Sequence, residues 1–262
     1  MYLINPVDVE REALAQGIAR TELEVPRLVF LSFNRSVVEE LSALCHLQER
    51  EWPAAGFTPA YSPPHKSWRG KLDQEEIRAF IPPMGASTLV SFCEELIHYG
   101  AEVIFLLCAS WGLGEKYLGE GQIHLPSYAV GMDGTSGHYG NRDWRVEAEP
   151  RVFKALAAGL ERVGAVWQEG GVGCCEAFYR ITPEMAEDFR RQGCLSMENG
   201  ETAALYSLGR ERGVPIGVLL QPYIDLEQRW SLSYMGDKYA ESGRLQVQAA
   251  VEASRILLAE QS

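Results

Sequence analysis

Short apolar runs alternate with amphipathic helical stretches along most of the chain, and this alternation limits the possible folds more than any other feature of the sequence. Strands are predicted by the apolar runs 28–31, 77–81, 103–109, 122–130 and 214–220, and by the glycine-rich run 165–173. Helices are predicted over 36–47, 87–99, 150–163, 201–212 and 245–260, with another that begins after Thr182. The stretch 52–68 fits neither the periodicity of a helix nor that of a strand. Strands separated by such helices are typical of βαβ units, so we expect one α/β domain over residues 1–262 with a largely parallel sheet.

The charge balance limits the partners of the chain. There are 36 acidic and 24 basic residues, and the formal net charge is −12. A field of this sign repels phosphate backbones and anionic lipids, so we expect neither nucleic acid nor membrane as a partner. The six cysteines form no CxxC pair, as expected for reduced thiols. These features predict a cytoplasmic protein.

No cofactor or metal motif stands out. The five histidines have no ligand spacing with one another or with the cysteines, so we predict no metal. No GxGxxG follows a strand, and the glycine-rich run 170–173 lacks the lysine of a P-loop. We therefore expect no cofactor. Because ligands of parallel sheets bind at the carboxyl ends of the strands, the loops that follow these ends are where a site should lie.

Several motifs near these loops, taken in order, resemble the nucleoside phosphorylase (phosphorylase-I) superfamily. They include a glycine-rich turn, a helix with an E-E-L core, and a strand that ends in a small-residue turn. Further along come a D-G-T-S loop, a base-pocket turn and an M-E-x-A helix. In this chain they read Gly85-Ala-Ser-Thr88, Glu94-Glu-Leu-Ile-His-Tyr-Gly100, Cys108-Ala-Ser-Trp-Gly-Leu113, Asp133-Gly-Thr-Ser-Gly-His-Tyr139, Ala177-Phe-Tyr179 and Met197-Glu-Asn-Gly-Glu-Thr-Ala-Ala-Leu-Tyr206. The resemblance runs from about residue 27 to residue 260 and implies a three-layer α/β/α domain with a mixed, mostly parallel sheet.

The resemblance implies cleavage or formation of the N-glycosidic bond of a nucleoside, through a sugar with oxocarbenium character. Hydrogen bonds that tighten as charge develops on the sugar would lower the barrier. Glu201 is the best match to the ribose-binding glutamate of the family, and Glu198 is the second choice. The resemblance also implies that Met197, which precedes Glu198, contacts the sugar. The alternative for Glu201 is a solvated carboxylate at a helix N-terminus.

The resemblance also assigns a base site and an acid. Phe178 would stack on the base, with Tyr179 and Cys175 beside it. Asp225 follows the strand 214–220, where purine-cleaving members of the family have the acid that protonates the leaving base. Its alternative is a loop aspartate that caps the next turn. The glutamine used by pyrimidine-specific members is missing after the Phe-Tyr turn, which disfavours uracil.

The phosphate site departs most from the family pattern. Arg35, Ser110, Gly85 and Lys66 are the candidate phosphate ligands. Leucines replace the loop glycine and the second arginine of the family, at 31 and 107, and the position of the arginine that a neighbouring subunit lends falls near Pro63. The N-terminal histidine that completes the sugar site of a partner is also missing.

Three functions therefore stay open. The first is a pentosyltransferase of the phosphorylase type, with phosphate as co-substrate and ribose 1-phosphate as product. The second is a nucleosidase that uses water on the same fold. The third is a non-catalytic protein that binds a nucleoside or nucleobase. The family implies a homo-oligomer, either a dimer or a trimer of dimers, with active sites shared between subunits.

Overall fold

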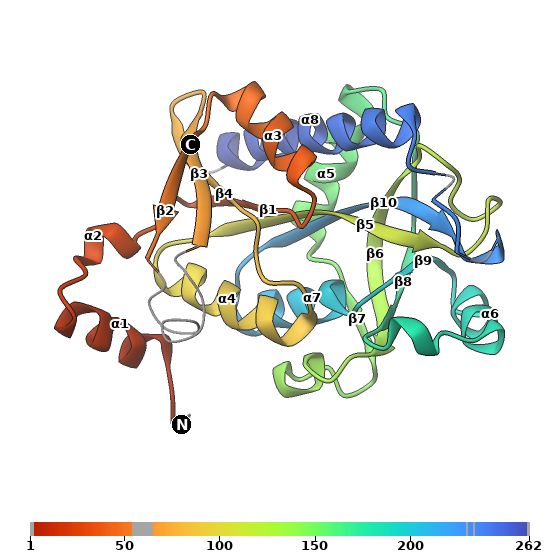
Figure 1. Cartoon of the computed structure of the whole chain (residues 1–262), viewed down its shortest axis with the longest axis horizontal. Helices are drawn as coiled ribbons and strands as arrows, with labels where there is room; N and C mark the ends of the chain where they lie inside the picture. The colour runs from red at the N-terminus through yellow and green to blue at the C-terminus, as the bar shows by residue number, and fades with distance from the viewer. Residues whose placement is uncertain (1–2, 54–64, 229, 233, 261–262) are drawn as a thin grey trace.

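The computed structural model describes residues 3–53, 65–228, 230–232 and 234–260 (Figure 1). Its strands are β1 (Leu28–Leu31), β2 (Gln48–Trp52), β3 (His65–Leu72), β4 (Glu75–Phe80), β5 (Val103–Gly112), β6 (Ile123–Met132), β7 (Arg145–Glu147), β8 (Trp167–Cys175), β9 (Cys194–Glu198) and β10 (Ile216–Asp225). Its α-helices are α1 (Pro6–Ala15), α2 (Arg20–Leu23), α3 (Arg35–Cys45), α4 (Ala86–His98), α5 (Pro150–Arg162), α6 (Pro183–Arg191), α7 (Glu201–Arg212) and α8 (Asp237–Ala259). The 3-10 helices are η1 (Ser136–Tyr139), η2 (Phe178–Arg180) and η3 (Leu226–Gln228).

The strands form one 10-stranded mixed sheet in the order β10-β6-β8-β9-β5-β1-β4-β3-β2, with β7 on β6. β10 also pairs with β5, so that β5, β10, β6, β8 and β9 close into a small barrel. The sheet continues from the barrel through β1 to an edge hairpin of β2, β3 and β4. The parallel pairs β1–β4, β1–β5 and β10–β5 bring the carboxyl ends of these strands to one edge of the sheet.

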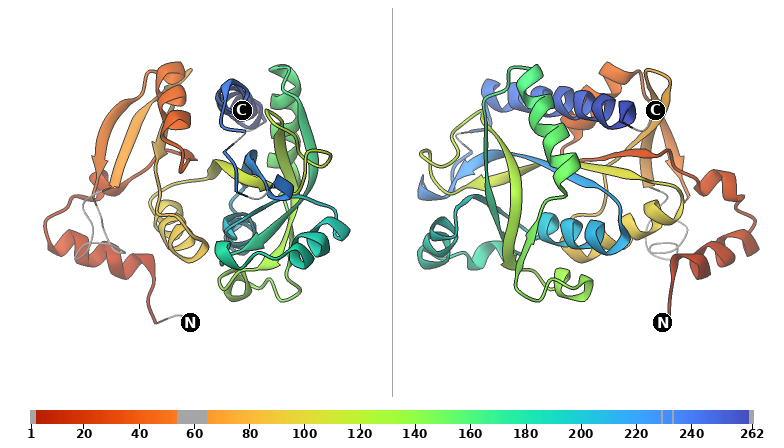
Figure 2. Two further views of the ribbon diagram at one scale, coloured as in Figure 1. Left: turned by 45° about the vertical axis from the view of Figure 1, so that its right-hand side comes forward. Right: turned by 180° about the vertical axis from the view of Figure 1, so that it is seen from behind.

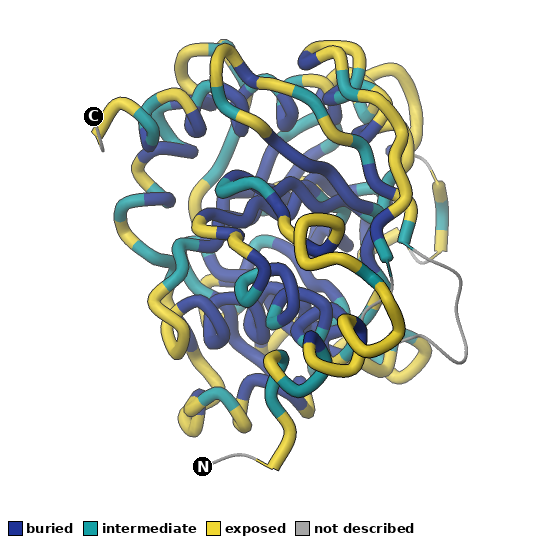
Figure 3. The backbone as a smooth tube through the Cα atoms, turned by 90° about the vertical axis from the view of Figure 1, so that its left-hand side faces the viewer, coloured by how far each residue is buried: buried dark blue, intermediate teal, exposed yellow. Residues whose placement is uncertain are grey.

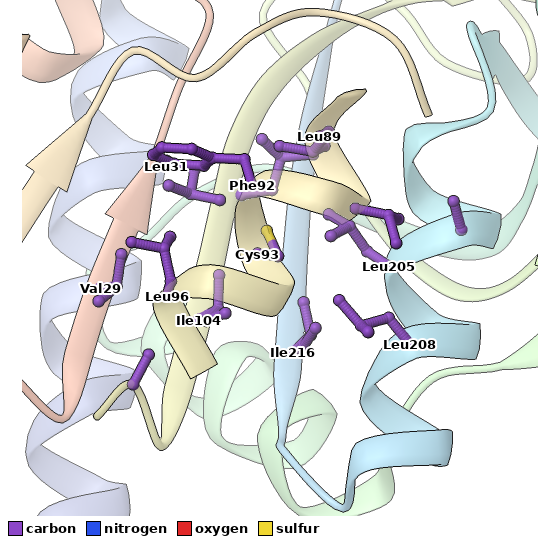
Figure 4. Close-up of a cluster of buried hydrophobic side chains, with 14 of the residues drawn as sticks. Val29, Leu31, Leu89, Phe92, Cys93, Leu96, Ile104, Leu205, Leu208 and Ile216 are labelled. Atoms are coloured by element: carbon purple, nitrogen blue, oxygen red, sulfur yellow. The ribbon is translucent and has the colours of Figure 1, made fainter. Parts of the chain in front are cut away.

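Helices cover the sheet on both faces, as Figures 1 and 2 show. Apolar residues of α3, α5 and α8 pack in one core cluster with the odd-numbered residues of β5. Apolar residues of α4 and α7 pack in a second cluster on the opposite face. Figure 4 shows part of the second cluster, in which Phe92 and Leu96 of α4 lie between Val29 of β1 and Leu205 of α7. The predicted three-layer α/β/α arrangement is confirmed.

Most of the predicted elements are present. The strands at 28–31, 77–81, 103–109, 122–130, 165–173 and 214–220 correspond to β1, β4, β5, β6, β8 and β10, and the helices at 36–47, 87–99, 150–163 and 201–212 to α3, α4, α5 and α7. The helix predicted after Thr182 is α6, whose first turn is capped by the Thr182 side chain, which accepts from Met185 N–H at 3.2 Å. The buried strands form the centre of the molecule in Figure 3.

The sequence interpretation missed several elements. The prediction that residues 52–68 are irregular was wrong in part, since β2 ends at Trp52 and β3 begins at His65. Both strands lie at the edge of the sheet, where β2 carries three consecutive charged residues and β3 buries only Ser67 and Leu72, so no apolar run marks them. Residues 54–64 lie outside the described part. α8 begins at Asp237 rather than at 245, and its polar first turns are held by Ser242, which donates to the Gln221 side chain.

The balance of the sheet also differs from the expectation. In the described residues, parallel and antiparallel strand pairs are equally numerous. The parallel pairs are β1–β4, β1–β5, β10–β5, β6–β8 and β8–β9. The antiparallel pairs are β10–β6, β2–β3, β3–β4, β5–β9 and β6–β7. The sheet is therefore mixed, as predicted, but parallel pairs do not predominate. The extra antiparallel pairs come largely from β2, β3, β7 and β9, the strands that the sequence interpretation missed.

Candidate active site

A pocket of about 280 Å³ opens at the carboxyl ends of β1, β5, β9 and β10. We call it the carboxylate pocket, because two glutamates line it. Its lining residues come from seven segments of the chain that converge there: Phe33, Asn34, Met84, Cys108, Ala109, Trp111, Glu198, Asn199, Glu201, Tyr223, Met235 and Tyr239. This edge of the sheet is where the topology predicts a ligand.

Glu201 is the first residue of α7, and its side chain is 3% exposed. Its Oε1 accepts a hydrogen bond from the backbone N–H of Gly85, the residue that precedes α4, at 3.2 Å. Burial raises the pKa of Glu201, and hydrogen bonds from the backbone and from the Asn199 side chain oppose the rise. The carboxylate therefore lies in the pocket beside two helix N-termini, which stabilise negative charge.

Glu198 ends β9 and is equally buried. Its Oε1 accepts from Thr202 N–H at 2.6 Å and from the Cys174 thiol at 3.5 Å, while Oε2 is buried with no hydrogen-bond partner among the described residues. Burial and the charge of neighbouring Glu201 raise the pKa of Glu198. Two carboxyl groups so placed disfavour double ionisation, so one proton is readily held in the pocket.

The other predicted sugar ligand, Met197, is placed differently. It is fully buried, pairs with Trp111 across the β5–β9 ladder, and packs in the small core cluster around Trp111 and Phe189. Met197 is not among the residues that line the carboxylate pocket. Its neighbour Glu198 is the residue of this pair that reaches the pocket.

Ser110 lies on β5 between Ala109 and Trp111, two residues that line the carboxylate pocket, but Ser110 itself is not in the lining. The Ser110 hydroxyl is 1% exposed and has no hydrogen-bond partner within the described part of the chain. A buried hydroxyl without a partner is costly, so this is a position where a ligand or water atom would be stabilised.

The predicted basic phosphate ligands do not lie in the carboxylate pocket. Arg35 is exposed in the first turn of α3 and pairs with Glu39 at 2.8 Å. Lys66 is exposed on β3 and pairs with Glu49 at 3.4 Å. Pro63 lies outside the described residues. Of the described residues that line the carboxylate pocket, none is a lysine, arginine or histidine.

The predicted base residues lie next to this pocket. Phe178 in η2 packs on Trp111, with ring centroids 4.6 Å apart. Tyr179 is 95% exposed and contacts Phe178 edge to face. Cys175, at the end of β8, is buried, and its thiol lies 3.8 Å from the carbonyl oxygen of Ala177.

Asp225 is buried at the end of β10, outside the lining of the carboxylate pocket. Its Oδ1 accepts from Glu227 N–H at 2.9 Å and its Oδ2 accepts from the Gln228 side chain at 3.1 Å. Both oxygens thus cap the turn η3. This geometry matches the alternative reading of Asp225, the loop cap, and its role as an acid stays a prediction.

Several lining residues were missed by the sequence interpretation. Trp111 and Tyr223 are joined by a hydrogen bond from Trp111 Nε1 to Tyr223 Oη at 2.7 Å. Asn34 and Tyr239 lie 3.4 Å apart through Nδ2 and Oη. Trp111 stands inside the quoted Cys108–Leu113 motif, so an aromatic residue in a small-residue turn was the available signal. Tyr239 lies on the first turns of α8, where no helix was expected.

The described residues contain neither a metal-binding cluster nor a membrane-spanning helix. No group of three or more His, Cys, Asp and Glu side chains in that part of the chain could hold a metal ion. No helix within it is long and apolar enough to cross a membrane. The absence of a cofactor stays a prediction.

The family model of the phosphorylase superfamily matches residues 36–229. Uridine phosphorylase from Klebsiella aerogenes is 22% identical over 256 residues, covering 92% of this chain and 96% of that protein. Uridine phosphorylase from Escherichia coli K12 is 21% identical over the same length. Among solved structures, purine nucleoside phosphorylase from Toxoplasma gondii in complex with immucillin-H superposes with a TM-score of 0.77 at 21% identity, covering 91% of this chain and 94% of that one.

Proposed function

The chain belongs to the phosphorylase superfamily, and on this premise we propose that it is a pentosyltransferase of the nucleoside phosphorylase type. It cleaves or forms the N-glycosidic bond of a nucleoside, with the ribose in the carboxylate pocket. The observation that carries the proposal is the buried pair Glu198 and Glu201 at the carboxyl ends of the strands. The curated relatives named uridine phosphorylase, which the chain matches over nearly their whole length, support it.

The chemistry follows from the charge that develops on the sugar. As the bond between C1′ and the base nitrogen breaks, its electron pair goes to the base and the ribose gains oxocarbenium character. A fixed carboxylate beside the sugar stabilises this charge more in the transition state than in the ground state. We assign Glu201 to the ribose hydroxyls, because its carboxylate lines the pocket and is held there by the Gly85 N–H.

Glu198 has a different role in this proposal. Its hydrogen bond with Thr202 N–H joins the end of β9 to the first turn of α7. Glu198 thereby sets the position of Glu201, and its unpartnered Oε2 is available to a hydroxyl of the sugar or to a water molecule.

Phosphate or water then forms the new bond to C1′. Phosphate is the co-substrate of phosphorolysis, and ribose 1-phosphate is its product. Water is the second candidate, favoured by one specific observation: the described lining of the pocket has two carboxylates and no cation. A phosphate dianion placed there would meet like charge, whereas water would not.

The test is a panel of purine and pyrimidine nucleosides, with and without phosphate, in which free base and the sugar product are quantified. Base release that requires phosphate supports phosphorolysis, and release of free ribose in its absence supports hydrolysis. Binding without turnover in either buffer leaves the third function, a nucleoside- or base-binding protein.

The proposal also covers the assembly state and the cellular location of the protein. We propose a homo-oligomer, a dimer or trimer of dimers, with active sites completed by neighbouring subunits, and a cytoplasmic location. The exposed apolar side chains of Leu3, Ile4 and Val7 at the start of the chain and in α1 fit a surface that is covered in such an assembly. Light scattering of the purified protein measures the assembly directly, and a monomeric mass contradicts it.

A further inference from the structure

Glu198 is buried among side chains that do not stabilise a negative charge. It is the last residue of β9 and is 4% exposed. The titratable side chains that its charge reaches are Cys174 on β8, Cys108 on β5, and Glu201 and Tyr206 on α7. None of these four described side chains is a cation. An ionised Glu198 would therefore be buried without a counter-charge among them, which is costly.

The two oxygens of the Glu198 carboxyl have different surroundings. Oε1 accepts hydrogen bonds from the backbone N–H of Thr202 at 2.6 Å and from the Cys174 thiol at 3.5 Å. Oε2 is buried and has no partner among the described residues. An ionised oxygen at the position of Oε2 would lose its hydration and gain no donor, whereas a protonated oxygen carries no charge. A proton held by this carboxyl therefore lies on Oε2.

Glu201 is the better place for the negative charge of the pair. The backbone N–H of Gly85 and the side chain of Asn199 both form hydrogen bonds with its carboxyl group. One of the two donors to Glu198 is a thiol, which is a weak donor. Two neighbouring carboxyl groups share their protons as a pair, and the group with the stronger donors keeps the charge.

Hydroxyl groups in the lining of the carboxylate pocket supply donors without charge. Trp111 Nε1 donates to Tyr223 Oη at 2.7 Å, and because an indole can only donate, the phenol proton is left for another acceptor. Asn34 Nδ2 donates to Tyr239 Oη in the same way, at 3.4 Å. Both tyrosines line the pocket. Such donors can bind an anion where the pocket is not itself doubly negative.

We propose that Glu198 holds one proton at neutral pH, so that the carboxylate pocket carries a single negative charge, on Glu201, and admits phosphate beside the ribose. Ionisation of Glu198 adds a second negative charge and excludes phosphate. This inference rests on the proposed function, since it takes phosphate as the co-substrate. Glu198 is a positioning residue in this assignment: it holds the first turn of α7 through Thr202 N–H, and its proton sets the charge of the pocket. Burial and the charge of Glu201, which raise the pKa of Glu198, support the assignment.

Infrared spectroscopy detects the proton directly, because the carbonyl band of a protonated carboxyl is separate from the bands of carboxylates. Spectra are recorded between about pH 6 and about pH 9, where ordinary Asp and Glu side chains are ionised. Glu198→Gln is neutral at every pH, and Glu211→Gln is the matched control, an exposed change on α7. The dissociation constant of inorganic phosphate is measured by calorimetry over the same range. Cleavage of purine and pyrimidine nucleosides is measured in parallel.

We expect the wild type and Glu211→Gln to show a protonated carboxyl at about pH 7 that is lost as the pH rises, and Glu198→Gln to lack it. Relative to Glu198→Gln, the dissociation constant of phosphate in the wild type should rise by about tenfold across the range, as the protonated fraction falls. Cys174→Ser replaces the thiol by a stronger donor to Oε1, so it should lose the band at lower pH than the wild type. This second variant tests the assignment if Glu198→Gln does not fold.

Three results overturn the inference: a wild type without a protonated carboxyl at neutral pH, phosphate binding with the same pH dependence in the wild type and Glu198→Gln, or no phosphate binding at any pH. If nucleosides are cleaved in such a case, only this inference fails. If the band and phosphate binding behave as expected and no nucleoside is cleaved, the proposed function fails and the position of the proton stands.

Discussion

The backbone N–H of Gly85 donates a hydrogen bond to Oε1 of Glu201 at 3.2 Å, between residues 116 positions apart in the sequence. Gly85 precedes α4 and Glu201 begins α7, so this contact ties the N-termini of two helices together at the mouth of the carboxylate pocket. It holds the carboxylate of Glu201 in the lining of the pocket. The proposed ribose site depends on this contact.

Replacement of Glu201 should abolish activity without unfolding the protein. Loss of one preorganised group that stabilises transition-state charge typically lowers kcat by roughly 10²–10³-fold. We expect Glu201→Gln to lose at least about 10²-fold in kcat. Glu211→Gln, an exposed change near the other end of α7, is the matched control and should keep wild-type activity. A Glu201→Gln enzyme with wild-type turnover would remove the residue from the sugar site.

The buried carboxyl pair predicts how stability depends on pH. Burial and the charge of Glu201 raise the folded-state pKa of Glu198 above its ordinary value of 4.5. The folded state therefore binds a proton more tightly than the unfolded state, and the stabilisation present below pH 4.5 is lost as the pH rises through the higher folded pKa. The fall in Tm between about pH 5 and about pH 8 should be smaller in Glu198→Gln than in the wild type. Parallel Tm profiles of the two proteins would contradict this.

The turn before α7 requires glycine. Gly200 has a φ of 98°, and a Cβ there would lie 2.8 Å from the Cβ of Asp133. We expect Gly200→Ala to lower the free energy of unfolding by about 1–3 kcal/mol, through backbone strain and the clash together. Gly213→Ala is the control, because Gly213 has a φ of 67° with no atom near the added Cβ. Urea unfolding measures both, and equal losses would show that the clash contributes nothing.

The position of Arg35 predicts a small effect on phosphate use. Its side chain is 77% exposed and paired with Glu39, and it does not line the pocket. Arg35→Ala should change the KM for phosphate, or the phosphate-independent rate, by less than about twofold, because the side chain lies outside the pocket. The change should also leave the fold intact, since surface ion pairs contribute little to stability. Ser110→Ala, which removes a buried hydroxyl near the carboxyl end of β5, should have the larger effect. A tenfold rise in the phosphate KM of Arg35→Ala would restore the arginine to the site.

Much of the fold could be predicted because the central strands and the helices on them have strong periodic signals. β5 is apolar on both faces, and α6 opens with Thr182 and Pro183. β2, β3 and β9 were missed, since β2 and β3 have no apolar run and β9 mixes buried polar and apolar side chains. Closure of the barrel through β10 and β5 is a long-range pairing that no local pattern encodes.

The site was predictable in part for a related reason. Motif order identified Glu198, Glu201 and Gly85, which the fold brings together. A motif does not encode the direction of a side chain, so Arg35 was predicted as a phosphate ligand although it faces solvent. Met197 was likewise predicted as a sugar ligand although it packs in a core cluster. Tyr223 reaches the pocket through the pairing of β10 with β5, and Tyr239 reaches it through the packing of α8 on the sheet.

The decisive measurement for the proposed function is the release of free base from purine and pyrimidine nucleosides by the wild type and by Glu201→Gln, with and without phosphate. We expect the wild type to release base together with ribose 1-phosphate or ribose, and Glu201→Gln, still folded, to be slower by at least about 10²-fold. Absence of base release from every nucleoside in both buffers would contradict it.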